Sequence, residues 1–240
     1  MGPDQLGGYA PNPITEIDTM RVLRAVSLAA ALAMTANVAV AQPIGLKFQS
    51  GPPSPAVTGY GYYVGPFTGT VTSNPTLPTI NLFCVDVLNT ISWGFQWTAN
   101  VTSLALSSIG NTRHPGSLDN YRKAAWLTTQ YQPSNKTQWA GIQAAVWNLL
   151  NPGTPNGGAA ETFWLNQANT FQTTSGWNSY NWGQFYVLTP VNAAGKSVGG
   201  GTQEFITTSP FVTPEPGTLI LLATGLVGVI GIVAVRSIRA

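Results

Sequence analysis

The stretch SLDNYRKAAWLTTQYQPSNKTQWAGIQAAVWNLLNPG, residues 117–153, decides the predicted fold class because it carries the helical periodicity of the chain. Ser117 suits the N-cap position of a helix over residues 118–131, and Pro133 ends that helix. The strand-like segments described below lie on both sides of this stretch. The helices are therefore predicted to be an insertion in a β-rich domain.

The second half of the stretch predicts another helix, over residues 136–150. Asn135 and Gln138 have the spacing of a capping box at its start. The sequence Asn151-Pro152-Gly153 ends it. Together the two helices form a predicted pair joined by a short turn.

Runs rich in β-branched and aromatic residues, divided by glycine and proline, flank the pair on both sides. They predict strands at residues 60–64, 67–72 and 80–87, and within 93–106, 183–190 and 202–210. One short helix is expected near residues 159–168, followed by an aromatic loop. The predicted fold class is α+β, with sandwich-like or barrel-like strands around an inserted helical pair.

The N-terminal region indicates export. Residues 20–41 (MRVLRAVSLAAALAMTANVAVA) have a basic start with Arg21 and Arg24, an apolar centre and an Ala-x-Ala ending. This pattern predicts a signal peptide that signal peptidase cleaves before Gln42. Residues 1–19 are polar and are interpreted as a leader or start-site extension. The folded extracytoplasmic domain is expected to span residues 42–212.

The C-terminal region, residues 213–240, combines three features in order. Pro214-Glu215-Pro216 comes first, residues 219–235 form an uncharged apolar run, and Arg236 and Arg239 follow it. The run is at the short limit for a transmembrane helix, and the arginines predict a cytoplasmic C-terminus. The whole segment resembles the PEP-CTERM sorting tail. That resemblance implies recognition by an exosortase, removal of the tail from an inner-membrane intermediate, and a cell-envelope or matrix location in a Gram-negative bacterium.

The composition excludes several classes of function. Charged residues make up 8% of the chain and the net charge is +2, so the basic patch that nucleic acid requires is not expected. One cysteine and one histidine, Cys84 and His114, cannot supply a zinc site of the usual ligand number. No metal and no cofactor is expected.

Cys84 and Gln143 are the two residues that need an explanation. A single cysteine in an exported chain suggests an intermolecular bridge or a reactive group. Gln143 falls on the apolar face of the predicted helix over residues 136–150, four residues from both Trp139 and Trp147. Either Gln143 is a core glutamine that hydrogen-bonds to backbone, or a reaction has consumed its amide.

The segments FCVDV (83–87), YRKAAWLTTQY (121–131) and AGIQAAVWNLL (140–150) together resemble the thioester domains of bacterial surface proteins, over roughly residues 60–190. The resemblance implies that the Cys84 sulfur and the Gln143 carbonyl are joined with loss of ammonia. It also implies covalent coupling, without turnover, to an amine on a surface protein or matrix polymer, so the protein is not expected to be an enzyme. The residues that complete the family motif here are Phe83, Asp86, Val146 and Trp147.

Two other functions stay open at this level. The first is a non-covalent structural or glycan-binding matrix protein, in which an aromatic platform could be formed by Trp164, Phe171, Trp177, Tyr180, Trp182 and Phe185. The second is a hydrolase with a Cys84–His114 dyad.

Overall fold

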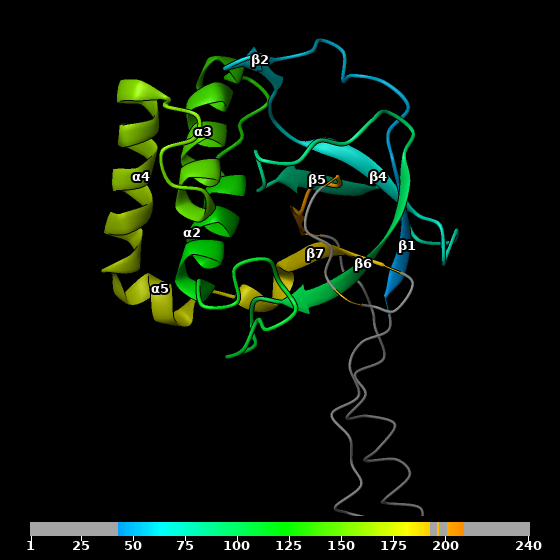
Figure 1. Ribbon diagram of the computed structural model, residues 1–240. Coiled ribbons are helices and arrows are strands. Elements are labelled where there is room, and N and C mark those ends of the chain that lie inside the picture. Colours follow the sequence, from blue (N-terminus) through cyan, green and yellow to red (C-terminus); the bar gives the residue numbers. More distant parts are fainter. Residues whose placement is uncertain (1–42, 193–195, 197–200, 209–240) are drawn as a thin grey trace, which may run out of the picture. The chain divides into compact units, whose positions relative to one another are not determined.

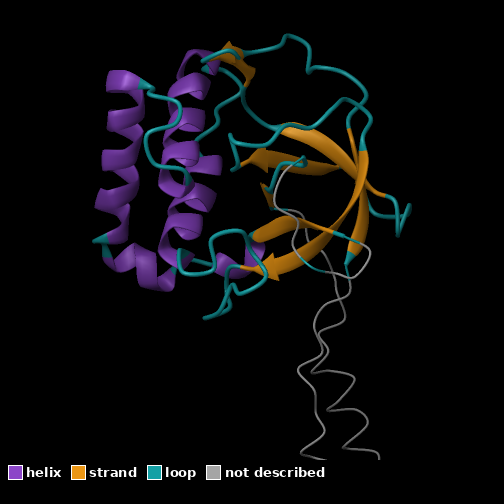
Figure 2. Cartoon of the chain, viewed as in Figure 1, coloured by secondary structure: helices purple, strands orange, loops and turns teal. Residues whose placement is uncertain are grey.

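Six antiparallel strands close into a barrel, and a layer of helices covers one side of it (Figures 1 and 2). The computed structural model describes residues 43–192, 196 and 201–208. Around the barrel the strand order is β1-β4-β5-β8-β7-β6, and β1 pairs with β6 to close it. The strands are β1 (Ile44–Phe48), β4 (Phe67–Val71), β5 (Ile80–Cys84), β6 (Gln96–Ser103), β7 (Tyr186–Val191) and β8 (Phe205–Thr207).

The barrel confirms the barrel-like form of the α+β prediction, but the sequence reasoning missed β1. This strand alternates as a barrel strand must, since Leu46 and Phe48 are buried while Lys47 is only partly so. Aromatic contacts fill part of the interior, with ring centroids of Phe48 and Phe67 5.4 Å apart and those of Phe48 and Phe205 5.8 Å apart. Closure of the barrel depends on β1, because it pairs with both β4 and β6.

The predicted strand over residues 80–87 is too long, because β5 ends at Cys84. Asp86 lies beyond the strand, and its carboxylate accepts a hydrogen bond from the Leu88 backbone N–H at 3.1 Å. This local bond turns the chain away from the sheet. The expectation that Leu82, Cys84 and Asp86 share one strand face therefore fails at Asp86.

The helical layer contains more than the predicted pair. Its elements are α2 (Leu118–Thr128), the 3₁₀ turn η1 (Lys136–Gln138), α3 (Trp139–Leu150), α4 (Gly158–Gln172), α5 (Ser175–Ser179) and the 3₁₀ turn η2 (Trp182–Gln184). The helix expected near residues 159–168 is thus longer, and the expected aromatic loop contains α5 and η2. Ten of the 12 residues of α3 are buried, which makes it the central helix of the layer.

The predicted caps of the two central helices do not form as expected. Ser117 precedes α2, but its side chain makes no capping hydrogen bond. The Asn135–Gln138 capping box is wrong as well, because residues 136–138 adopt 3₁₀ geometry and the Asn135 side chain accepts a bond from Thr137 Oγ1 instead. The helices are therefore held mainly by burial of their apolar faces.

A small hairpin made of β2 (Thr58–Gly59) and β3 (Tyr62–Tyr63) lies against α3. The approach is close at Gly59, where an added Cβ would lie 2.7 Å from the Ala140 Cβ. At the next residue of the helix, a Cβ at Gly141 would lie 2.8 Å from the Ala160 Cβ of α4. These two glycines let neighbouring segments enclose α3 tightly.

In the described part of the chain, none of the helices has both the length and the hydropathy needed to span a bilayer. The predicted signal peptide (20–41), the predicted transmembrane helix (219–235), Pro214-Glu215-Pro216, Arg236 and Arg239 all lie outside the described residues.

A candidate thioester site between β5 and α3

Cys84 lies at the end of β5 and is 2% exposed. Its thiol accepts a hydrogen bond from Trp147 Nε1–H, with 3.4 Å between nitrogen and sulfur, and it donates to the Asp86 backbone oxygen at 3.4 Å. Burial raises the pKa of the Cys84 thiol to about 12. The hydrogen bond from Trp147 and the positive charge of Arg113 act to lower this pKa, but burial has the larger effect. At neutral pH this thiol is therefore protonated and shielded from solvent.

Gln143 is 1% exposed and contacts Cys84 directly. Its Nε2 donates to the Cys84 backbone oxygen at 2.7 Å, and its Oε1 accepts a hydrogen bond from the Tyr131 hydroxyl at 2.9 Å. The fold thus brings the two predicted residues together although 59 positions separate them in the chain. The sequence reasoning did not assign a role to Tyr131.

The four residues predicted to support the pair have different positions. Trp147 contacts the sulfur, and the Phe83 ring packs against the Tyr131 ring with centroids 5.6 Å apart. Val146 is a core residue of α3, 1% exposed. Asp86 accepts a hydrogen bond from the Cys84 thiol through its backbone oxygen. Its carboxylate pairs with Arg113 instead.

The Asp86 carboxylate belongs to a buried ionic cluster that the sequence reasoning missed. Glu204, fully buried, accepts hydrogen bonds from the Tyr121 hydroxyl at 2.5 Å, from Thr189 Oγ1 at 2.5 Å and from the Arg113 backbone N–H at 3.1 Å. Asp86 also accepts a bond from Asn89 Nδ2 at 2.7 Å. The only signal in the sequence was a lone acid, Glu204, within an otherwise uncharged strand segment.

His114 does not share the surroundings of Cys84. Its ring packs against Tyr121, with centroids 6.3 Å apart, and its backbone N–H donates to the Tyr121 hydroxyl at 3.3 Å. The thiol has Trp147 and Asp86 as its partners instead. The geometry therefore offers no support for a Cys84–His114 dyad.

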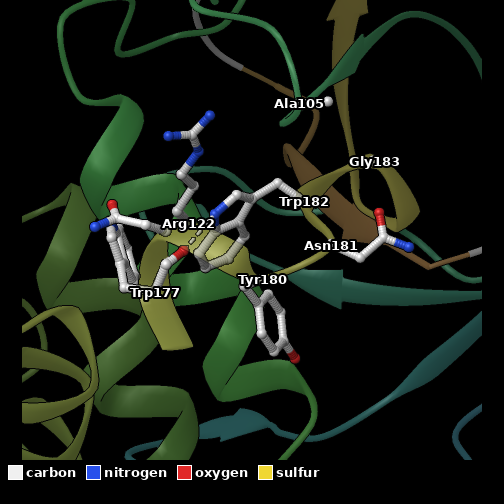
Figure 3. Close-up of a pocket in the computed structure, with 8 residues that line it drawn as sticks. Ala105, Arg122, Trp177, Tyr180, Asn181, Trp182 and Gly183 are labelled. Carbon is white, nitrogen blue, oxygen red and sulfur yellow. Dashed lines mark hydrogen bonds between the residues drawn. The ribbon is translucent and has the colours of Figure 1, made fainter. Parts of the chain in front are cut away.

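Part of the aromatic segment, including Tyr180, lines a separate open hollow of about 410 Å³, in which Figure 3 shows Trp177 and Trp182 near Arg122. The Arg122 guanidinium lies 5.5 Å from the Trp182 ring centroid and donates to the Leu104 oxygen from both Nε and Nη2. Trp177 and Trp182 are each only 7% exposed. Little ring face is thus left for stacking against a sugar.

The other members of the predicted aromatic platform pack within the fold. Phe171 stacks on Trp126 with centroids 5.0 Å apart, and Phe185 is fully buried. Trp164 is partly buried against the core. The six aromatic residues therefore do not form one continuous exposed surface.

In the described residues, the barrel and the helical layer enclose a buried, hydrogen-bonded cysteine–glutamine pair, Cys84 and Gln143. Comparison with known families matches residues 212–239 to the PEP-CTERM protein-sorting motif. This motif implies recognition by an exosortase during export and an envelope or extracellular location in a Gram-negative bacterium. Comparisons with curated proteins and with solved structures gave no significant match.

Proposed function

We propose that the exported domain forms an internal thioester between Cys84 and Gln143 and uses it to attach covalently to an amine on a matrix polymer or surface protein. The observation that carries this proposal is the 2.7 Å hydrogen bond from Gln143 Nε2 to the Cys84 backbone oxygen. It brings the only thiol of the chain and a fully buried primary amide into one water-poor site.

Formation of the bond would be a balanced exchange of groups. The Cys84 sulfur adds to Gln143 Cδ, the Cδ–Nε2 bond breaks, and the nitrogen leaves as ammonia with the thiol proton. Trp147 Nε1–H, which lies 3.4 Å from the sulfur, stabilises negative charge on sulfur as it attacks and later as it leaves. Burial limits the access of water, which protects the thioester from hydrolysis.

Attachment would reverse the roles of the same atoms. The amine nitrogen bonds to Gln143 Cδ, the Cδ–Sγ bond breaks, and one amine proton passes to the sulfur. The product is an amide to the partner and a free Cys84 thiol. Since no step regenerates the thioester, each molecule reacts once, which suits an attachment protein better than an enzyme.

The link would also stabilise the fold. Joining residues 84 and 143 closes a loop of about 60 residues, which on the chain-entropy estimate used for disulfides contributes about 4 kcal/mol. A domain that works outside the cell would benefit from that gain, since Cys84 has no second cysteine with which to form a disulfide.

Intact mass spectrometry of the purified exported domain tests the proposal. We expect a mass lower than calculated by one ammonia, no thiol labelling after rapid denaturation, and one methylamine adduct on Gln143 together with a labelled Cys84. Cys84→Ala and Gln143→Ala should each abolish the ammonia loss and the adduct, and only the second should leave a thiol that labels after unfolding.

The full calculated mass, with a thiol that labels once the chain is unfolded, would overturn the proposal. The non-covalent matrix protein would then be the better description, with Gln143 as a core glutamine bonded to backbone.

A further inference from the structure

The hydroxyl of Tyr131 points at Gln143 Oε1, the carbonyl oxygen of the group that would react. Tyr131 lies three residues beyond the end of α2, and its side chain is 9% exposed. Its O–H donates to Gln143 Oε1 at 2.9 Å, within the range of a good hydrogen bond. Among the described residues, no other group donates to this oxygen.

We propose that Tyr131 is a catalytic oxyanion donor, both in the formation of the thioester and in its opening by an amine. This inference rests on the proposed thioester. In each step a nucleophile adds to Gln143 Cδ, and the electron pair of the carbonyl moves onto Oε1. A donor that already points at this oxygen stabilises the developing negative charge without having to reorganise.

The two hydrogen bonds of the Gln143 amide have different fates in this reaction. The bond from Nε2 to the Cys84 oxygen disappears when ammonia leaves, because the nitrogen is lost. The bond from Tyr131 to Oε1 is present in the unreacted amide, and it can form in the thioester and the final adduct as well, because both retain this oxygen. Tyr131 is therefore the group that can act on the acyl oxygen at every stage.

The surroundings of Tyr131 hold the ring in place independently of the hydroxyl. The ring packs against Phe83 at 5.6 Å and edge-on against Trp139 at 5.7 Å between centroids. Trp139 is itself fixed, because its Nε1–H donates to the Gln132 oxygen at 3.0 Å. Burial also holds the pKa of Tyr131 well above its usual value, so the hydroxyl keeps its proton.

Tyr131→Phe removes the donor and keeps the ring, so it is the informative variant. We expect the second-order rate of methylamine opening, measured by Cys84 labelling and intact mass, to fall by about 10²- to 10³-fold. Ammonia loss after refolding should slow similarly. The thioester carbonyl stretch in the infrared should move to higher frequency, which shows that the hydroxyl donates to the acyl oxygen in the thioester itself, while the rate of opening tests its role in the reaction.

Tyr180→Phe is the matched control, because it removes a tyrosine hydroxyl at the separate hollow near Arg122. Its rates and carbonyl frequency should equal those of the wild type. If Tyr131→Phe does not fold, a fluorinated tyrosine at position 131 replaces it. The fluorinated ring is a stronger donor, and we expect it to accelerate methylamine opening.

The outcomes separate the two proposals. A wild-type domain without ammonia loss refutes the thioester itself. If the wild type forms the thioester and Tyr131→Phe opens at the same rate, the role of Tyr131 is refuted, whatever the carbonyl frequency, and the thioester stands. If the fluorinated variant is the one measured, an unchanged rate refutes that role in the same way.

Discussion

Two buried polar clusters meet at residues 84–86. One contains neutral groups and the other contains charged groups. In the first, the neutral thiol of Cys84 and the neutral amide of Gln143 are bonded to Trp147 and Tyr131. In the second, charged Asp86 and Glu204 contact Arg113. Both clusters are almost entirely removed from solvent, with Cys84 2%, Gln143 1%, Asp86 3% and Glu204 0% exposed.

The difference shows what each cluster is built to do. A buried charge is tolerated only when charges and donors surround it, and the ionic cluster meets that condition with Tyr121, Thr189 and Asn89 as further donors. The neutral cluster instead places a nucleophile and an acyl group side by side. We interpret the ionic cluster as the anchor of the chain after β5, whereas the neutral cluster is the site of the proposed thioester.

The largest effect on stability is expected from breaking the ionic cluster. Arg113→Met should lower the free energy of unfolding by roughly 3–5 kcal/mol, because it leaves two carboxylates buried without their cation. Denaturant unfolding measures this loss, and the folded fraction should still lose ammonia.

Arg122→Met is the control for that substitution. Its guanidinium binds the Leu104 oxygen beside an open hollow rather than a buried acid, so it should cost clearly less. Equal losses in the two variants would contradict the anchoring role of Arg113.

A smaller effect is expected from the titration of the Cys84 thiol in a chain that lacks the thioester, such as Gln143→Ala. Burial raises the Cys84 pKa from 9.0 to about 12, so between these values the folded chain holds a proton that the unfolded chain releases. Stability due to this thiol is therefore complete below pH 9 and is lost as the pH rises toward 12. At pH 10 the loss should be about 1.4 kcal/mol, the value for one pKa unit.

Comparison of Gln143→Ala with Cys84→Ala isolates this titration. Neither variant forms a thioester, and only the first retains the thiol. The buried Tyr121 and Tyr131 also have raised pKa values, which come first from burial, and both residues are present in each variant, so their contributions largely cancel even though Cys84 adds to the shift of Tyr131. Parallel stability curves from pH 8 to about 10.5 would contradict the raised thiol pKa.

Sequence alone predicts a feature of these clusters only when neighbouring residues in the chain carry a pattern for it. The helix over 139–150 and most barrel strands carry periodic apolar patterns, so the fold class was predictable. Cys84 and Gln143 stood out because each is unusual where it occurs. Tyr131 and Glu204 did not, since their roles come from partners 12 residues away for Tyr131 and up to 91 for Glu204. Such contacts depend on how helices and strands pack together in the fold, which no local pattern encodes.

The smallest effect concerns access to the neutral cluster from the β2–β3 hairpin. The Tyr62 ring packs edge-on against the Trp147 ring, with centroids 5.5 Å apart, and Trp147 in turn contacts the Cys84 sulfur. Tyr62 is 40% exposed, so it forms the outer layer over this side of the site. Tyr62→Ala should cost about 0.5–1.5 kcal/mol of stability, the range for an aromatic pair.

The same substitution should uncover Trp147 and speed the opening of the thioester by methylamine severalfold. Tyr63→Ala is a closely matched control, because Tyr63 is the next residue of β3 and packs edge-on against Trp93 instead, with centroids 5.3 Å apart. It should lose a similar amount of stability and leave the rate of methylamine opening unchanged. If both variants open faster by the same factor, general loosening of the hairpin controls access, and the Tyr62–Trp147 contact has no special part in it.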